Sequence, residues 1–186
     1  MLDREVEKNL LEKAKEDKEA FGIIFEEYFS LILNYIFGRI GLKEEAKDLT
    51  EEVFTKALLS IDSYKDRGIP YSNYLIKIAT NLVNNFIKKN SKFILKDDIE
   101  IEYKEDLLDI EEKKFFYIQK ALLKLPLNYQ NILTLKIFEK KKIKEIGEIL
   151  NLNENTVKTI LKRGTEKLKK ELEKDETFLK DFNLKI

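Results

Sequence analysis

The chain has 186 residues, which is enough for one ordinary domain or two small ones. Its 35 basic and 35 acidic residues cancel, unlike the strong positive charge of proteins that coat nucleic acid without regard to sequence. Cysteine and histidine are absent and no glycine-rich phosphate loop occurs, which excludes disulfides, thiolate zinc sites and the usual nucleophile–base pairs. We therefore expect a protein that is not an enzyme and has no metal or other cofactor.

The N-terminal segment and the most apolar run both argue against a membrane protein. Residues 1–20 are densely charged, whereas a signal peptide needs an uninterrupted apolar segment. The apolar run over residues 29–40 is interrupted by Asn34, Gly38 and Arg39 and is too short to cross a bilayer. The expected location is cytoplasmic, with no membrane insertion of its own.

Helical periodicity dominates the sequence, and no stretch alternates apolar and polar residues as a strand does. The composition changes most over residues 96–112, where nine acidic residues are accompanied by two lysines. We interpret residues 93–112 as an acidic linker between two small helical domains, at 1–92 and 113–175, with a C-terminal tail at 176–186. A solvated acidic helix is the alternative interpretation of the linker. The predicted fold class is all-α.

The first domain is expected to contain three helices. The first covers about residues 20–40 and ends at Gly41, and the second begins near Lys43. A loop over residues 61–71 is rich in turn-forming residues and precedes the third helix, for which Ser72 is the predicted N-cap. In that helix apolar residues recur at helical spacing and define one face. This face consists of Leu75, Ile78, Ala79, Leu82, Val83 and Phe86.

The third helix is unusual for the amides on its other faces. The residues expected to point outward are Asn73, Lys77, Thr80, Asn81, Asn84, Asn85, Lys88 and Lys89. Because asparagine is a poor helix former, four amides indicate specific hydrogen bonding, to base edges or to unpaired bases. Tyr64 and Tyr71 of the preceding loop are candidates to stack on an unpaired base. Codon bias toward asparagine is the alternative explanation.

The second domain is expected to contain four helices, of which the last two carry the strongest signal. A short helix is closed by Pro126, and another covers about residues 129–137. The last two, at 143–150 and from 154 to about 172, meet at Leu150–Asn153, where Asn151 readily enters the left-handed conformation that a sharp turn requires. Leu152 can fill the space between these helices, Asn153 can cap the second, and Gly147 offers a small surface where they cross. This pattern predicts a helix-turn-helix.

The final helix has the layout of a DNA-recognition helix, with polar residues near its start and basic residues along its length. Residues 136–170 hold 11 basic and 5 acidic side chains, a local excess of six positive charges in a neutral chain. The candidate DNA-binding residues are Glu154, Asn155, Lys158, Thr159, Lys162, Arg163 and Lys167. A helical hairpin with a solvated, lysine-rich face is the alternative.

Both halves of the chain carry motifs of one known family. Residues 46–54 and 74–82, followed by Lys88 and Lys89, resemble the polymerase-binding and promoter-melting domain of extracytoplasmic-function sigma factors. The second half is similar to their upstream-promoter-binding domain, through residues 125–126, 132–135, 143–152 and 156–164. The resemblance extends over about residues 15–172 and presents both halves in the family's order and spacing.

The resemblance implies an alternative sigma factor that binds core RNA polymerase and directs promoter recognition and melting, with an anti-sigma factor as a further candidate partner. Asp48, Glu51 and Glu52, which by themselves form only a solvated acidic face, would dock on the clamp helices of the largest polymerase subunit. The linker would thread toward the active-site and RNA-exit channel. The residues that would capture the melted element are Tyr64, Tyr71, Asn73, Lys77, Asn81, Asn84, Asn85 and Lys88.

Some positions depart from the family's usual pattern. The chain has Glu51 in place of glutamine, Tyr74 in place of tryptophan and Thr80 in place of a basic residue, and it has Gly164 where the family usually has alanine. Lysines replace an arginine pair, which keeps the charge but loses the bidentate grip on phosphate. The rival hypotheses are a free-standing helix-turn-helix transcriptional regulator and a helical adaptor protein.

Overall fold

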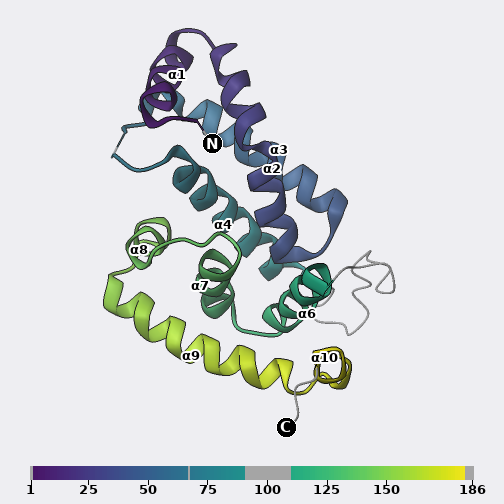
Figure 1. Cartoon of the computed structure of the whole chain (residues 1–186). Coiled ribbons are helices and arrows are strands. Elements are labelled where there is room, and N and C mark those ends of the chain that lie inside the picture. The colour runs from purple at the N-terminus through teal and green to yellow at the C-terminus, as the bar shows by residue number, and fades with distance from the viewer. Residues whose placement is uncertain (1, 67, 91–109, 183–186) are drawn as a thin grey trace.

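The structure, a computed structural model, describes residues 2–66, 68–90 and 110–182, and every regular element within these ranges is a helix (Figure 1). The predicted all-α fold class is confirmed. The elements in chain order are α1 (Arg4–Glu16), α2 (Ala20–Ile40), α3 (Lys43–Leu59), the short 3₁₀ helix η1 (Ile61–Ser63), α4 (Tyr71–Lys89), α6 (Ile110–Leu123), α7 (Leu127–Ile137), α8 (Ile143–Leu150), α9 (Glu154–Leu172) and α10 (Glu176–Asp181).

Local capping residues fix several helix ends at the positions that the sequence predicts. Gly41 ends α2 in the left-handed conformation, with φ of 71°. Asn151 ends α8 in the same conformation, with φ of 55°, and Asn153 caps α9 by accepting a hydrogen bond from the Thr156 N–H at 2.8 Å. The chain between α8 and α9 is therefore determined by two capping asparagines that lie two positions apart.

Helix α1 has no counterpart in the sequence-based prediction. Asp3 caps it by accepting a hydrogen bond from the Glu5 N–H at 2.9 Å. Its buried residues Glu7, Leu11 and Ala14 lie four and three positions apart, so they form one face, and α1 packs against α2. Most of the charged residues of α1 lie on its other faces, and Glu7 is the buried exception.

Three predicted boundaries differ from the structure. Helix α4 begins at Tyr71 after Pro70, so Ser72 lies buried inside the helix and is not its cap. Of the predicted linker 93–112, positions 93–109 lie outside the described residues, and the remainder is the first turn of α6. Part of the predicted tail forms α10, whose Phe178 ring contacts the Tyr117 ring of α6 at 5.5 Å between centroids.

The hydrophobic core runs continuously from the N-terminal helices into the C-terminal ones. α4 packs against α8, and α2 packs against both α6 and α7 (Figure 1). One cluster of buried residues therefore joins α1–α4 to residues of α7, α8 and α9, while a smaller cluster lies between α6, α7 and α9. The C-terminal residues of the larger cluster are Ile132, Leu135, Ile146, Ile149 and Val157. The two halves are thus packed together.

Helix α2 is longer than the apolar run that the sequence suggested. By length and composition alone it is able to cross a membrane, the one such helix among the residues described. In the structure it is a core helix, because α1, α3 and α4 all pack against it and residues along its whole length are buried. These include the charged side chain of Arg39.

Candidate nucleic-acid interfaces

The turn between α8 and α9 is built as a helix-turn-helix. The Leu152 N–H donates to the Gly147 carbonyl at 2.8 Å, which brings the chain back across α8. A Cβ at Gly147 would lie 2.6 Å from the Leu152 carbonyl oxygen, so only glycine fits this crossing. The predicted role of Gly147 as a small surface is confirmed, and the turn fixes the direction in which α9 leaves α8.

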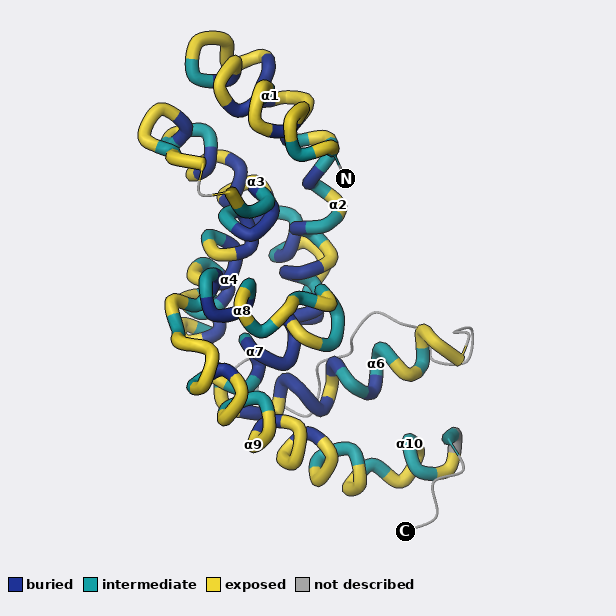
Figure 2. The backbone as a smooth tube through the Cα atoms, turned by 60° about the vertical axis from the view of Figure 1, so that its left-hand side comes forward, coloured by how far each residue is buried: buried dark blue, intermediate teal, exposed yellow. Residues whose placement is uncertain are grey.

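Helix α9 presents its predicted DNA-binding residues to solvent. All seven, from Glu154 to Lys167, are exposed, while Val157, Gly164 and Leu168 face inward (Figure 2). A Cβ at Gly164 would lie 3.0 Å from the Tyr129 ring, so the absence of a side chain lets α7 approach closely. Lys167 is the least free of the seven, because its Nζ lies over the Tyr129 ring at 5.7 Å from the centroid.

The outward residues predicted for α4 and the two predicted stacking tyrosines differ in their exposure. Lys77, Asn81, Asn85 and Lys88 are exposed, and Asn84 and Tyr64 are half-buried. The three that the structure buries are Tyr71, Asn73 and Thr80.

The burial of Thr80 and Asn73 has identifiable partners. The Thr80 hydroxyl is 2.7 Å from the Tyr35 hydroxyl of α2, so this residue belongs to the core and not to an outward face. Asn73 Oδ1 accepts a hydrogen bond from Lys141 Nζ at 2.7 Å, across the contact between the two halves. The expectation of outward exposure is therefore wrong for both residues, because partners far away in the sequence cover them.

Two adjoining clefts lie between α4 and the helix-turn-helix. The larger, of about 540 Å³, is lined by Tyr64, Asn73 and Lys77 on one side and by Glu148 and Asn151 on the other. The smaller, of about 270 Å³, places further amides opposite one another. These are Asn81, Asn84, Asn128, Asn131 and Asn151. Such a lining of amides, lysine and aromatic ring has the chemistry that recognises nucleic-acid bases. The asparagines of α7 were missed because no local pattern links them to α4.

The Tyr64 and Tyr74 rings line the larger cleft, and the buried Tyr71 ring packs against both of them. The Tyr64 ring meets the Tyr71 ring edge to face at 4.9 Å between centroids and lies 5.0 Å from the Tyr74 ring. The Tyr74 hydroxyl is 2.7 Å from the Ser60 hydroxyl. Burial raises the pKa of Tyr64 to about 12 and raises the pKa of Tyr71 further, so both phenols remain neutral near pH 7. Of the two predicted stacking residues only Tyr64 reaches the cleft.

A buried cation supports α4 from behind. Arg39 of α2 is almost completely buried and donates to the Tyr35 hydroxyl at 3.4 Å and to Asn84 Oδ1 at 3.3 Å. Its Nε has no hydrogen-bond partner among the described residues, and burial lowers the pKa of the guanidinium. In the sequence Arg39 only interrupts an apolar run, so no local pattern reveals its contact with the amide-rich helix α4.

The acidic residues of α3 form a separate surface. Asp48, Glu51 and Glu52 are all exposed, and Glu52 pairs with Lys56 at 3.3 Å. Within the described parts of the chain, no group of acidic residues is arranged to hold a metal ion. The surface is therefore a set of solvated carboxylates on the outside of the N-terminal half.

Family models match both halves of the chain. Residues 24–93 match the model of sigma-70 region 2, and residues 115–168 match the model of sigma-70 region 4. The chain is 32% identical over 187 residues to the extracytoplasmic-function RNA polymerase sigma factor SigW of Bacillus subtilis strain 168, covering 92% of this chain and 98% of SigW. It is 30% identical to the RNA polymerase sigma factor SigV of the same organism, covering 81% of this chain and 87% of SigV.

Two solved structures share the fold at low sequence identity. CnrH, solved in complex with the cytosolic domain of CnrY, has a TM-score of 0.70 and 16% identity, covering 91% of this chain and 99% of that one. The sigma factor RpoE of Bartonella quintana, solved with the anti-sigma factor NepR, has a TM-score of 0.61 and 18% identity, covering 84% and 98%. The arrangement of the helices is therefore one that solved proteins also adopt.

Proposed function

Because the chain belongs to the extracytoplasmic-function sigma factors of bacterial RNA polymerase, it is an alternative sigma factor for transcription initiation, and we propose which of its surfaces performs each step. Its partners are core RNA polymerase and promoter DNA, and an anti-sigma factor is a further candidate. The observation that carries the assignment of surfaces is the exposed polar and basic face of α9, held by a helix-turn-helix in a chain that also matches region 2. The work is done by binding energy alone, without a catalytic residue, in the cytoplasm where polymerase acts.

The acidic surface of α3 is the proposed polymerase-docking site. Asp48 and Glu51 project freely into solvent, so a basic partner surface can reach both without any rearrangement of the chain. Carboxylates that are exposed and clustered also steer a basic partner during the encounter. The clamp helices of the largest polymerase subunit are the proposed partner.

The outer face of α9 is proposed to read the upstream promoter element as duplex DNA. Asn155 and Thr159 lie near the start of the helix, where a recognition helix contacts base edges. Lys162, Arg163 and Lys170 lie farther along, where they can neutralise backbone phosphates. Base contacts would set the sequence preference, and phosphate contacts would set the register and most of the affinity.

The amide-rich face of α4 and the Tyr64 loop are proposed to capture unpaired bases of the melted element. The cleft between α4 and α8 holds the required groups, but Asn73 faces Lys141 across the contact between the halves. The C-terminal domain must therefore leave α4 before a strand can enter. Contacts with splayed bases, worth about 1–3 kcal/mol per base, would offset the few kcal/mol that unstacking a base costs. Separate domains at 1–92 and 113–175, joined by the linker 93–112, are proposed to permit this movement.

Run-off transcription with purified core polymerase tests the proposed function. The chain should confer initiation from a defined start on a core enzyme that alone does not recognise promoters. A matched variant, Asp48→Lys with Glu51→Lys, should retain helicity and duplex binding by α9 but lose core association and transcription. A chain that binds upstream DNA yet never restores initiation would be a free-standing helix-turn-helix regulator. Should the double variant co-purify with core as the parent does, the α3 surface is only solvated.

A further inference from the structure

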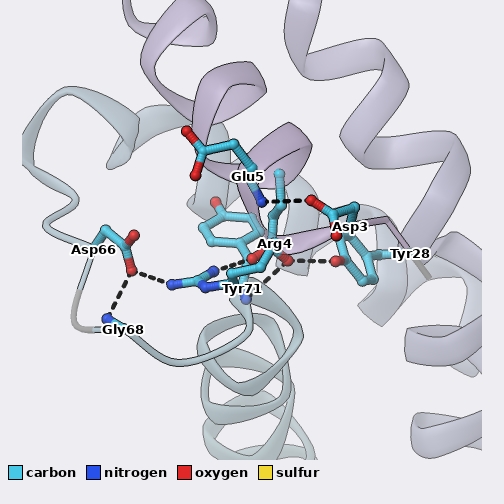
Figure 3. A network of polar contacts seen from close by, with 8 residues as sticks. Asp3, Arg4, Glu5, Tyr28, Asp66, Gly68 and Tyr71 are labelled. Atoms are coloured by element: carbon cyan, nitrogen blue, oxygen red, sulfur yellow. Dashed lines mark hydrogen bonds and ion pairs between the residues drawn. The ribbon is translucent and has the colours of Figure 1, made fainter.

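Helix α1 reaches the base-capture loop through a buried carboxylate. Glu7 has a relative exposure of 2%, and its Oε1 accepts hydrogen bonds from the Tyr28 hydroxyl and, at 3.0 Å, from the Tyr71 N–H (Figure 3). The Tyr71 N–H is the first of α4, where the helix leaves backbone donors without intrahelical partners and favours negative charge. Glu7 therefore fixes the start of α4 from a different helix.

Arg4 extends the same network to the loop itself. Its guanidinium pairs with Glu7 and with Asp66, and the same Asp66 oxygen accepts a hydrogen bond from the Gly68 N–H at 2.9 Å (Figure 3). Gly68 has φ of 76°, so Asp66 closes a turn that requires glycine. Arg4 thus connects α1 to the turn that leads from η1 into α4.

The residue that these contacts position is Tyr64. Its ring packs edge to face against the Tyr71 ring, and the Tyr71 N–H is hydrogen-bonded to Glu7. Tyr64 also lies two residues before Asp66, which pairs with Arg4. Tyr64 is therefore held from both sides by contacts that originate in α1. A purely structural helix could pack here with apolar side chains, whereas burying a carboxylate is costly unless several donors satisfy it.

We propose that Arg4 and Glu7 are positioning residues for promoter melting, which fix the loop after η1 so that the Tyr64 ring is presented to an unpaired base. This rests on the proposed function of the α4 cleft. Neither residue would touch DNA. Loosening the loop would lower both the affinity for the melted strand and the preference for one base at the captured position, because an incorrectly placed ring cannot select by fit.

A double-mutant cycle on the holoenzyme tests the proposal. The variants are Arg4→Met, Asp66→Asn and the two combined, measured as affinity for a fork-junction template whose melted element is single-stranded. Each single variant should weaken capture on the order of tenfold and flatten the preference among the four bases at the captured position. The combined variant should bind the template no more weakly than the weaker-binding of the two single variants. Lys15→Met, which breaks the exposed pair with Glu12 on the same helix, is the matched control and should behave as the parent.

Three results overturn the proposal. The first is that both single variants bind the fork-junction template as tightly as the parent. The second is that the combined variant loses affinity by the product of the two single losses. The third is a loss of affinity that leaves the base preference intact, since that would be a general loss of stability. Glu7→Gln, which keeps the shape and one acceptor, provides a second variant if Asp66→Asn folds poorly. Tyr64→Ala separates the two proposals: if it captures normally, base capture by this loop is wrong and so is the inference, whereas a defect only in Tyr64→Ala removes the inference alone.

Discussion

The two helices proposed to contact promoter DNA are presented very differently in the same chain. On α9 every candidate residue is exposed, and the side chains on the opposite side of the helix are buried against α6, α7 and α8. On α4 the candidates are divided, because one side of the helix packs on α2 and α3 while α8 lies against another (Figure 1). Asn73 is buried, and its Oδ1 accepts a hydrogen bond from Lys141, which lies just before α8. The proposed surface for duplex DNA is open, and the proposed surface for the melted strand is covered in part, at Tyr71 and Asn73.

Under the proposed assignment of surfaces, the packing of the helices would set the order in which the two promoter elements bind. On that assignment, upstream duplex DNA would meet α9 without rearrangement, whereas a melted strand would reach the covered part of α4 only after α8 had moved away. The contact between the halves is partly polar and imperfectly satisfied. Asn73 and Gln119 each make one hydrogen bond across it, but Asn73 Nδ2 and Gln119 Oε1 are buried without a hydrogen-bond partner among the described residues. Unsatisfied buried groups weaken an interface, so separation costs less than for an apolar contact.

The largest effect is expected from Ile149→Asp, which should uncover α4 and so remove the difference in exposure between α4 and α9. Ile149 lies where α8 packs on α4 and lines both clefts. A buried carboxylate without a partner should cost the closed arrangement about 3 kcal/mol or more. The radius of gyration measured by small-angle scattering should rise, and single-stranded promoter DNA should bind the free chain more tightly. Ile110→Asp, at an exposed position, is the matched control. Unchanged scattering with retained helicity would show that α8 does not hold the halves together.

A smaller loss is expected from Gly147→Ala, which should disturb α9 and leave α4 intact. Its Cβ would lie 2.6 Å from a backbone oxygen that cannot rotate away, so overpacking should exceed the gain in helix propensity and lower stability by about 2 kcal/mol. Gly164→Ala meets only side-chain atoms of Tyr129 and Leu133, at 3.0 Å or more, and should change stability by less than about 1 kcal/mol. Urea unfolding of the pair checks this. Equal losses in both would contradict the assigned turn geometry.

Substitutions on α9 should distinguish contacts to base edges from contacts to backbone phosphates. Asn155→Ala should change the preference at one or two positions of the upstream element, worth about 1–2 kcal/mol of discrimination. Lys170→Ala should weaken binding evenly across sequences and lower the salt slope by about one. Binding titrations of holoenzyme against a substituted promoter set, repeated at several salt concentrations, measure both. A uniform loss for Asn155→Ala would place α9 on the DNA backbone and not in the groove.

Little change in stability is expected from Arg39→Met, although this side chain is buried. The guanidinium is buried behind α4 with two long hydrogen bonds, so an apolar side chain of similar volume should leave the free energy of unfolding unchanged or raise it by about 1 kcal/mol. Lys162→Met on α9, where the charge is solvated, should change stability by less than about 0.5 kcal/mol but weaken DNA binding. A loss of more than about 2 kcal/mol in Arg39→Met would mean that the Arg39 contacts are a favourable network.

The same contrast explains what the sequence predicts well. The α8–α9 unit was predicted to the residue because its determinants are local: a left-handed asparagine, an N-cap two residues later and one small residue at the crossing. The exposure of the α9 candidates followed from an amphipathic pattern with one buried side. Local chemistry is enough where a helix packs on one side only.

The covered parts of the molecule were predicted less well, for a physical reason. On α4 the periodicity selected Ile78 and Phe86, which are half-buried, and missed Ile76 and Ile87, which are buried. A single apolar stripe cannot describe a helix that contacts neighbours on several sides. The partners of Asn73 and Glu7 lie 68 and 64 residues away, so no local pattern could reveal them. Helix α1 did leave a signal, in the spacing of Leu11 and Ala14 after the cap at Asp3.

The position of the acidic surface on α3 has a consequence for kinetics. Its carboxylates are exposed while α8 packs on α4, so under the proposed docking assignment polymerase would bind the closed chain before the halves separate. The observed rate of holoenzyme formation would then rise with polymerase concentration and level off at the first-order rate of opening. The plateau would be insensitive to salt, whereas the initial slope would fall as salt screens the encounter. Ile149→Asp would raise the plateau and leave the slope unchanged.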